Sequence, residues 1–231
     1  MCWFEKNKQL LARERRLVKE HFPELKFYTA KEKTLILAGE IKLKQEDEIL
    51  DVYEAEIIFP NNYPHGVPLL REVGGRIPRV LDRHTTKNGF CCLCVRGEYR
   101  KFWKQGDSIV DFINKLVIPY LANQSYYERM GEWSGEEYSH GVKGTIEFYK
   151  DALDVEDEKI IILFLEKIIN GEKIGRNEKC FCGSNKKIKK CHLQSYSELK
   201  NSIYKEGAIK DLEEIGKYVN KQIEEVSKEL K

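Results

Sequence analysis

Apolar and polar positions along the first third of the chain follow two different periods. Residues 3–22 carry leucines, a valine and a phenylalanine on one side of an otherwise charged segment, and Pro23 ends it. Residues 34–44 and 52–59 then alternate apolar with polar side chains, and a shorter stretch of this kind covers residues 67–73. The pattern predicts an opening helix and then an antiparallel β-meander, which is typical of an α+β fold.

Helical spacing returns in the second half of the chain. Apolar residues within residues 109–124 recur every three or four positions, and residues 144–170 indicate two more helices that end before Gly171. From Ile209 to Leu230 apolar residues again recur at spacings of three and four between lysines and glutamates, which predicts a long amphipathic helix. This last helix could dock on its own chain, form a short coiled coil or bind a partner.

The chain of 231 residues is long enough to bury one principal core and to carry a smaller appendage. We expect a first domain at residues 1–150, a helical linker at 151–173, a small module at 174–193 and a C-terminal amphipathic helix at 194–231.

Charge narrows the classes of partner. Lysines and arginines number 40 against 38 acidic residues, for a net charge of +2, so no global field favours nucleic acid or an anionic membrane. The first 22 residues are charged throughout and hold no apolar stretch long enough for a signal peptide or a membrane span. We therefore expect a cytoplasmic protein.

Seven cysteines in a reducing compartment point to metal ligands or nucleophiles rather than to disulfides. Cys180, Cys182, Cys191 and His192 follow the spacing C-x-C-x8-C-H, with Gly183 available for the turn between the pairs. Four such ligands suit a closed tetrahedral zinc site. So small a module has almost no core, so Zn²⁺ would supply its folding energy, about 10–16 kcal/mol in comparable modules.

The segment around these ligands resembles the SEC-C motif. The likeness covers a lead-in of glycine, arginine and asparagine at residues 175–177, the four ligands and the basic loop between them. The resemblance implies an appended piece that contacts a partner rather than one that performs a reaction. The loop lysines, Lys186, Lys187, Lys189 and Lys190, could meet an acidic protein or phosphate, or form an ordinary solvated face.

Three further cysteines, Cys91, Cys92 and Cys94, lie within four positions. Together with His84 they could form a second zinc site, but adjacent residues on an extended segment point in opposite directions and would coordinate poorly. All three could also be buried packing residues.

The residues around this cluster resemble the ubiquitin-conjugating enzyme fold. The stretch "VYEAEIIFPNNYPHGVPLL" has the strand, the "FP" and "YP" pairs and the following proline that mark this family, and "GFCCL" at residues 89–93 matches its Gly-x-x-Cys-Leu. Trp103 lies downstream, where the family has a tryptophan. The resemblance implies that Cys92 forms the thioester, with Cys91 on the hydrophobic position before it.

One departure from the family concerns His84. Eukaryotic members carry a His-Pro-Asn tripeptide, whose asparagine is associated with stabilising the oxyanion, and the matching residues here are Asp82, Arg83 and His84. The imidazole could donate a hydrogen bond to the tetrahedral intermediate, where one good donor lowers the barrier by about 2.7–4 kcal/mol. It could instead act as a base toward the amine or the Cys92 thiol, or be structural.

The resemblance extends over residues 1–150 and includes the downstream stretch "PYLANQSYYERMGEWSGEEYSHGVKGTIEFY". In this region the chain is similar to bacterial relatives of the ubiquitin-conjugating enzymes found in antiphage operons, notably those of CBASS. There the conjugating protein acts on the C-terminus of a nucleotidyltransferase that makes cyclic oligonucleotides. The resemblance therefore implies an acyl transferase of bacterial antiphage defence, with that C-terminus or a ubiquitin-like protein as its partner.

Two other functions stay open at this stage. The chain could be a non-catalytic adaptor that docks partners through its zinc module and C-terminal helix. Nucleic-acid binding has little support, because no basic stripe interleaved with aromatic residues accompanies the lysines. The sequence shows no ATP-binding loop of Walker type, so we do not expect adenylation by this chain, and the need for a separate activating enzyme stays open.

Overall fold

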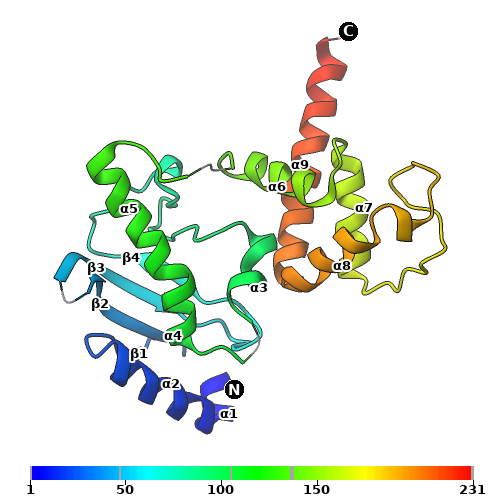
Figure 1. The fold of residues 1–231 in the computed structure, drawn as a ribbon. Helices are drawn as coiled ribbons and strands as arrows, with labels where there is room; N and C mark the ends of the chain where they lie inside the picture. The colour runs from blue at the N-terminus through cyan, green and yellow to red at the C-terminus, as the bar shows by residue number, and fades with distance from the viewer. Residues whose placement is uncertain (1, 47, 105, 136–137, 230–231) are drawn as a thin grey trace. The chain divides into compact units, whose positions relative to one another are not determined.

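The computed structural model describes residues 2–46, 48–104, 106–135 and 138–229, which divide into two compact units (Figure 1). The first unit comprises Met1–Cys94 and Phe102–Glu137, and the second comprises Val95–Lys101 and Tyr138–Lys231. None of the described helices combines the length and the low charge that crossing a membrane would require.

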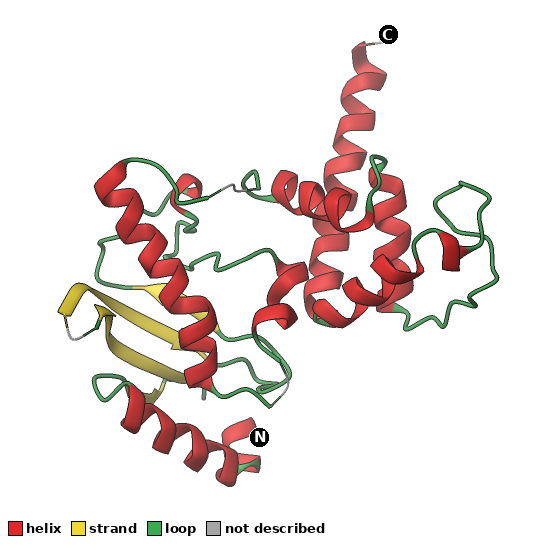
Figure 2. Ribbon diagram, viewed as in Figure 1, coloured by secondary structure: helices red, strands yellow, loops and turns green. Residues whose placement is uncertain are grey.

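The first unit is built around a four-stranded antiparallel sheet in the order β1-β2-β3-β4, so the meander predicted from alternation is present. Its elements are α1 (Trp3–Lys6), α2 (Lys8–His21), β1 (Lys26–Thr29), β2 (Leu35–Gln45), β3 (Glu48–Ile58), β4 (Leu69–Glu72), the 3-10 turn η1 (Leu81–Arg83), α4 (Ile109–Phe112), the π-helical turn η3 (Ile113–Val117) and α5 (Ile118–Met130). Mixed α and β structure is therefore confirmed for this chain (Figure 2).

Strand register decides which face of the sheet is buried. Leu37 pairs with Ile57 and Ile41 pairs with Tyr53, and all four side chains are buried on one face. The long helical segment from α4 to α5 belongs to the same unit, and α5 contacts β2 (Figure 1). Alternation thus gives the sheet one apolar face that packs in the core of the unit.

A buried carboxylate joins the opening helix to this helical segment. Glu14 of α2 is fully buried, and its Oε2 accepts a 2.8 Å hydrogen bond from the backbone N–H of Ile109 at the beginning of α4. Burial raises the pKa of Glu14, and the hydrogen bond from Ile109 opposes that shift. This hydrogen bond links α2 to the beginning of α4.

Several boundaries differ from those expected. The opening helix is interrupted at Asn7, because the Asn7 side chain accepts a 3.0 Å hydrogen bond from the Leu10 N–H and caps α2. β1 was not expected, since a strand of four residues is too short to show a clear alternation. β3 begins at Glu48 rather than at residue 52, so part of the segment expected to connect two strands is itself paired with β2.

The second unit is helical. Its elements are the 3-10 turn η2 (Arg96–Glu98), the first residues of α3 (Tyr99–Phe102), α6 (Val142–Leu153), α7 (Glu158–Ile169), the 3-10 turn η4 (Ile188–Lys190), α8 (Leu193–Ser202) and α9 (Lys205–Glu229). Helices α6, α7 and α9 contact one another around a core that includes Phe148, Phe164 and Ile215. The expected single helix at residues 194–231 is two helices, because Ile203 adopts an extended conformation between α8 and α9.

A buried ion pair holds η2 in this unit. Asp211 of α9 is fully buried, pairs with the Arg96 guanidinium and accepts a 2.7 Å hydrogen bond from the Tyr149 hydroxyl. Burial raises the pKa of Asp211, and the charge of Arg96 opposes that shift. Residues 95–101, which follow the cysteine cluster directly in sequence, are therefore fixed parts of the helical unit.

Candidate metal centre and candidate cysteine site

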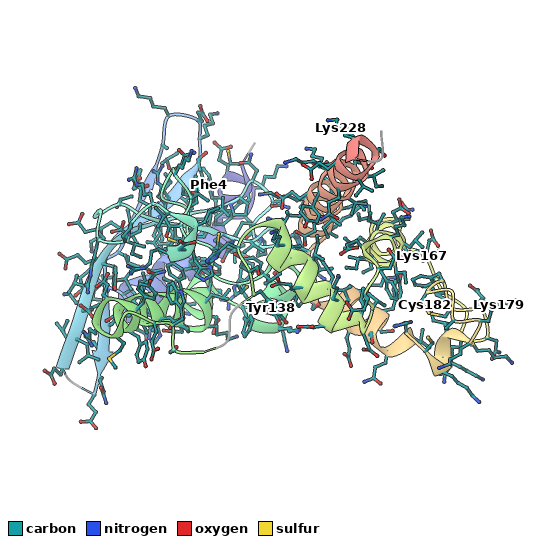
Figure 3. The ribbon with its side chains drawn as sticks, turned by 90° about the horizontal axis from the view of Figure 1, so that it is seen from above. Phe4, Tyr138, Lys167, Lys179, Cys182 and Lys228 are labelled. Carbon is teal, nitrogen blue, oxygen red and sulfur yellow. The ribbon has the colours of Figure 1, made fainter. Side chains whose placement is uncertain are left out.

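A short hairpin brings the two halves of the Cys/His motif together. The Cys180 N–H donates to the Lys186 carbonyl at 2.8 Å, and the Ile188 N–H donates to the Glu178 carbonyl at 2.9 Å. Gly183 supplies the positive φ that the turn needs, with a φ of 81°. Figure 3 shows Cys182 on this loop near Lys167 of α7, whose ammonium lies 5.3 Å from the centroid of the neighbouring Phe181 ring.

The four ligand atoms meet at one point of the second unit. The sulfur atoms of Cys180, Cys182 and Cys191 and a nitrogen of His192 all lie within 4.8 Å of one another. The Cys180 and Cys191 sulfurs are each 3.2 Å from the His192 Nδ1, and the Cys182 and Cys191 sulfurs are 3.5 Å apart. Zn–S bonds of about 2.3 Å give ligand separations of roughly 3.5–3.8 Å in a tetrahedron. The donor set and its spacing therefore fit a metal ion, and zinc is consistent with them.

Aromatic packing fixes this cluster to the helical core. The Phe164 ring of α7 lies 4.4 Å from the Phe181 ring and meets the His192 ring edge-on at 5.5 Å. Ile188, between the two ligand pairs, is fully buried. The candidate metal ligands and the core of the second unit are thus in direct contact.

The surroundings shift the pKa values of Cys180 and Cys182 in opposite directions. Burial raises the pKa of Cys180 to about 11. Burial also acts to raise the pKa of Cys182, but hydrogen bonds with the side chain and backbone of Ser184 outweigh it and lower that pKa to about 6. The four loop lysines are exposed around the cluster.

The second site is the cysteine segment of the first unit. The Cys91 N–H donates to the Leu70 carbonyl at 2.9 Å, and the Cys92 N–H donates to the His84 carbonyl at 2.8 Å. This extended backbone turns neighbouring side chains to opposite sides, as the sequence predicts. Cys91 is buried, Cys92 is exposed and Cys94 is half-buried.

These cysteines do not form a second metal centre in the part of the chain that the structure describes. Among the described residues, the cysteines and histidine at 180–192 are the group of three or more possible ligands that lie close enough together to share one metal ion. The structure brings His84 next to Cys92 through their backbone hydrogen bond rather than through a common ligand site.

We expect iodoacetamide at pH 8 to alkylate Cys92 at least tenfold faster than Cys91. Burial raises the pKa of Cys91 to about 11, so only about one thiol in a thousand is ionised at pH 8, whereas a free cysteine has a pKa of about 8.5. Peptide mapping by mass spectrometry at several times gives both rates. Equal rates in the folded protein would contradict the difference in exposure.

Helix α5 holds the turn that carries His84. The Gln124 side chain donates to the Arg83 carbonyl at 2.9 Å and accepts from the Arg83 Nε at 2.9 Å. The Tyr120 hydroxyl, one turn earlier on the same face, lies 3.3 Å from the His84 carbonyl and 3.0 Å from the Thr85 hydroxyl. His84 itself has a left-handed backbone, with a φ of 47°.

Sequence reasoning missed Tyr120 and Gln124 as parts of this site. Their signal was a glutamine four positions after a tyrosine, one helical turn away on the same face, and Gln124 is fully buried. A buried amide needs hydrogen-bond partners, so such a residue indicates a specific contact even before the partner is known.

The comparisons with known proteins concern the metal cluster. A family model described as the SEC-C motif matches residues 176–194, which include all four ligands. The protein translocase subunit SecA of Koribacter versatilis (strain Ellin345) is 74% identical to this chain over 23 residues. The match covers 10% of this chain and spans 2% of the length of that SecA. The chain therefore contains a SEC-C motif whose cysteines and histidine lie together in the structure.

Proposed function

We propose that this protein is a ubiquitin-conjugating-like acyl carrier that forms a thioester through Cys92 in bacterial antiphage defence. The observation that carries the proposal is the exposure of Cys92 between a buried Cys91 and a half-buried Cys94. An acyl carrier needs one thiol that is accessible and not consumed by a metal. The order of helix, antiparallel meander, cysteine segment and helix supports the same proposal.

The chemistry would proceed in two steps. The Cys92 thiolate attacks the activated C-terminal carbonyl of a partner protein, a C–S bond forms, and the activating group leaves. An acceptor amine then attacks the thioester carbonyl, the C–S bond breaks, and the amine loses a proton as the Cys92 thiolate departs. The acyl donor would be the activated C-terminus of a CBASS nucleotidyltransferase or of a ubiquitin-like protein.

We propose that His84 acts on this reaction, and the backbone hydrogen bond from the Cys92 N–H to the His84 carbonyl supports this by keeping the two residues adjacent. In this proposal the His84 ring donates a hydrogen bond to the oxyanion or acts as a base for the amine. The reaction as proposed takes place in the cytoplasm, where thiols stay reduced.

We further propose that the metal of the SEC-C motif is Zn²⁺ bound by Cys180, Cys182, Cys191 and His192. Three thiolates and one imidazole complete a tetrahedral set and leave no position for a substrate, so the ion is structural. The exposed lysines beside it form the surface that a partner would contact.

An alternative function is that of a non-catalytic adaptor. Ile223 and Val226 of α9 are 52% and 55% exposed, which is a surface that a docking helix could offer. The adaptor and the carrier differ in one outcome, because only the carrier forms a covalent bond through Cys92.

Transfer from a synthetic peptide thioester tests the proposed function. The peptides carry the C-terminal sequence of a CBASS nucleotidyltransferase or of a ubiquitin-like protein, and the full-length chain is analysed by intact-mass spectrometry. We expect an adduct on Cys92 that hydroxylamine or excess thiol removes. Peptide binding without any adduct, at peptide concentrations that saturate the protein, would favour the adaptor.

A further inference from the structure

The segment that follows α5 returns toward the His84 turn and brings Trp133 to it. The Trp133 ring meets the His84 ring edge-on, with centroids 5.2 Å apart, and lies 4.5 Å from the Tyr127 ring. Gly131 reverses the chain with a φ of 77°, and its N–H donates to the Tyr127 carbonyl at 2.8 Å. Trp133 thus contacts His84 from a turn that is fixed to the end of α5.

Two hydrogen bonds hold this turn in place. The Asn123 Oδ1 atom of α5 accepts from the Ser134 hydroxyl at 2.7 Å and from the Ser134 N–H at 3.3 Å. Because Ser134 is the neighbour of Trp133, its anchoring restricts where the indole ring can lie.

Arg83 lies within the same group of rings. Its guanidinium is 4.5 Å from the Tyr127 centroid and 5.9 Å from the Trp133 centroid, both within the range of cation–π attraction. Arg83 also bonds to Gln124. Both residues of the turn, Arg83 and His84, are therefore held by rings from the end of α5 and the segment after it.

The carbonyl oxygen of His84 connects this turn to the Cys92 segment. The His84 carbonyl accepts the Cys92 N–H at 2.8 Å, so the left-handed backbone of His84 sets where the Cys92 segment begins to extend. The Nε2 atom of His84 is itself buried. The orientation of the His84 ring and the placement of the Cys92 backbone thus depend on the same turn.

We propose that Trp133 is a positioning residue for acyl transfer, which holds His84 and, through the His84 carbonyl, the Cys92 segment. This inference rests on the proposed function of Cys92. Trp133 touches neither the sulfur nor the acyl group in this role. It keeps the turn in one conformation, so that the thiolate meets the donor carbonyl in a constant geometry.

The experiment compares Trp133→Leu, Trp133→Ala and Trp133→Phe in the full-length chain. Transfer from the peptide thioester gives kcat and KM, and hydrogen exchange followed by mass spectrometry gives the protection of the Cys92 amide. Tyr126→Ala is the matched control, because Tyr126 is a 38% exposed aromatic residue on α5 next to Tyr127. Thermal unfolding measures the stability of every variant.

We expect Trp133→Leu to lower kcat at least tenfold with KM for the peptide unchanged within twofold. Exchange at the Cys92 amide rises at least tenfold, whereas the amides paired between β2 and β3 keep their protection. Trp133→Phe restores kcat to within about threefold of the wild type, because a ring can again meet His84 edge-on. Tyr126→Ala changes neither measurement.

The other possible results distinguish a failure of the positioning role of Trp133 from a failure of the proposed function of Cys92. A folded Trp133→Leu protein with wild-type kcat and wild-type exchange at Cys92 overturns the inference, and so does a loss of protection spread evenly over β2 and β3. If Trp133→Ala does not fold, the leucine and phenylalanine variants decide alone. If the wild type forms no adduct, the proposed function fails, and unchanged exchange at Cys92 in Trp133→Leu then rejects the positioning role separately.

Discussion

Replacing Cys92 with alanine is expected to abolish the acyl adduct, with a loss of at least a hundredfold in the rate of transfer from a peptide thioester. The reason is that Cys92 is the exposed thiol of its segment, whereas Cys91 is buried with a pKa of about 11. Cys91 therefore cannot replace Cys92 as the nucleophile at neutral pH. Intact-mass spectrometry after a fixed incubation measures the loss directly.

A serine at the same position gives a more specific result. Cys92→Ser can form an oxyester where the wild type forms a thioester, and an ester resists excess thiol that would remove a thioester. We expect a slower but thiol-resistant adduct, mapped to residue 92 by peptide sequencing. A thiol-sensitive adduct on this variant would mean that another cysteine carries the acyl group.

Neighbouring cysteines provide the matched controls. Cys91→Ala and Cys94→Ala each leave Cys92 in place, so we expect both to keep transfer within about threefold of the wild type. Cys91→Ala should also cost some stability, since it removes a buried side chain from the first unit. If Cys91→Ala abolishes the adduct while the protein stays folded, Cys91 is the acyl carrier and the choice of Cys92 is wrong.

The sheet could be predicted from sequence because its signal is local. Buried side chains alternate with more exposed ones in the later part of each long strand, at Ile41 and Leu43 of β2 and at Tyr53, Ala55 and Ile57 of β3. β1 has only four residues, and its identity as a strand depends on pairing with Leu35 to Ala38, which lies outside its own sequence. The break between α8 and α9 was missed because Ile203 fits the apolar pattern of a helix, whereas it is buried in an extended conformation.

The two candidate sites also differ in how far apart along the chain their residues lie. The candidate metal ligands could be chosen from sequence because Cys180, Cys182, Cys191 and His192 lie within 13 residues, and one hairpin brings them together. Trp133 lies far from His84 along the chain, and no local pattern connects them. Contacts of that kind depend on where α5 packs, which only the folded structure shows.

Removal of the metal is expected to unfold the segment from about residue 174 to the beginning of α8 while the sheet of the first unit stays intact. A structural zinc ion contributes about 10–16 kcal/mol in small modules, and around the cluster Ile188 is buried and Phe181 only partly buried, which is little apolar packing to replace it. Zinc content, measured by native mass spectrometry, should be one ion for each chain before chelation. Loss of amide protection around residues 176–194 follows the loss of the ion.

Core contacts should extend the effect of chelation into the helical unit. Phe164 packs on Phe181 and His192, so amides of α7 near Phe164 should lose protection together with the metal cluster, whereas amides paired between β2 and β3 keep theirs. Cys182→Ser should reproduce this pattern, and Cys94→Ser is the matched control, because Cys94 lies outside the cluster. A chelated chain with unchanged protection at residues 176–194 would show that the fold of this segment does not depend on a metal.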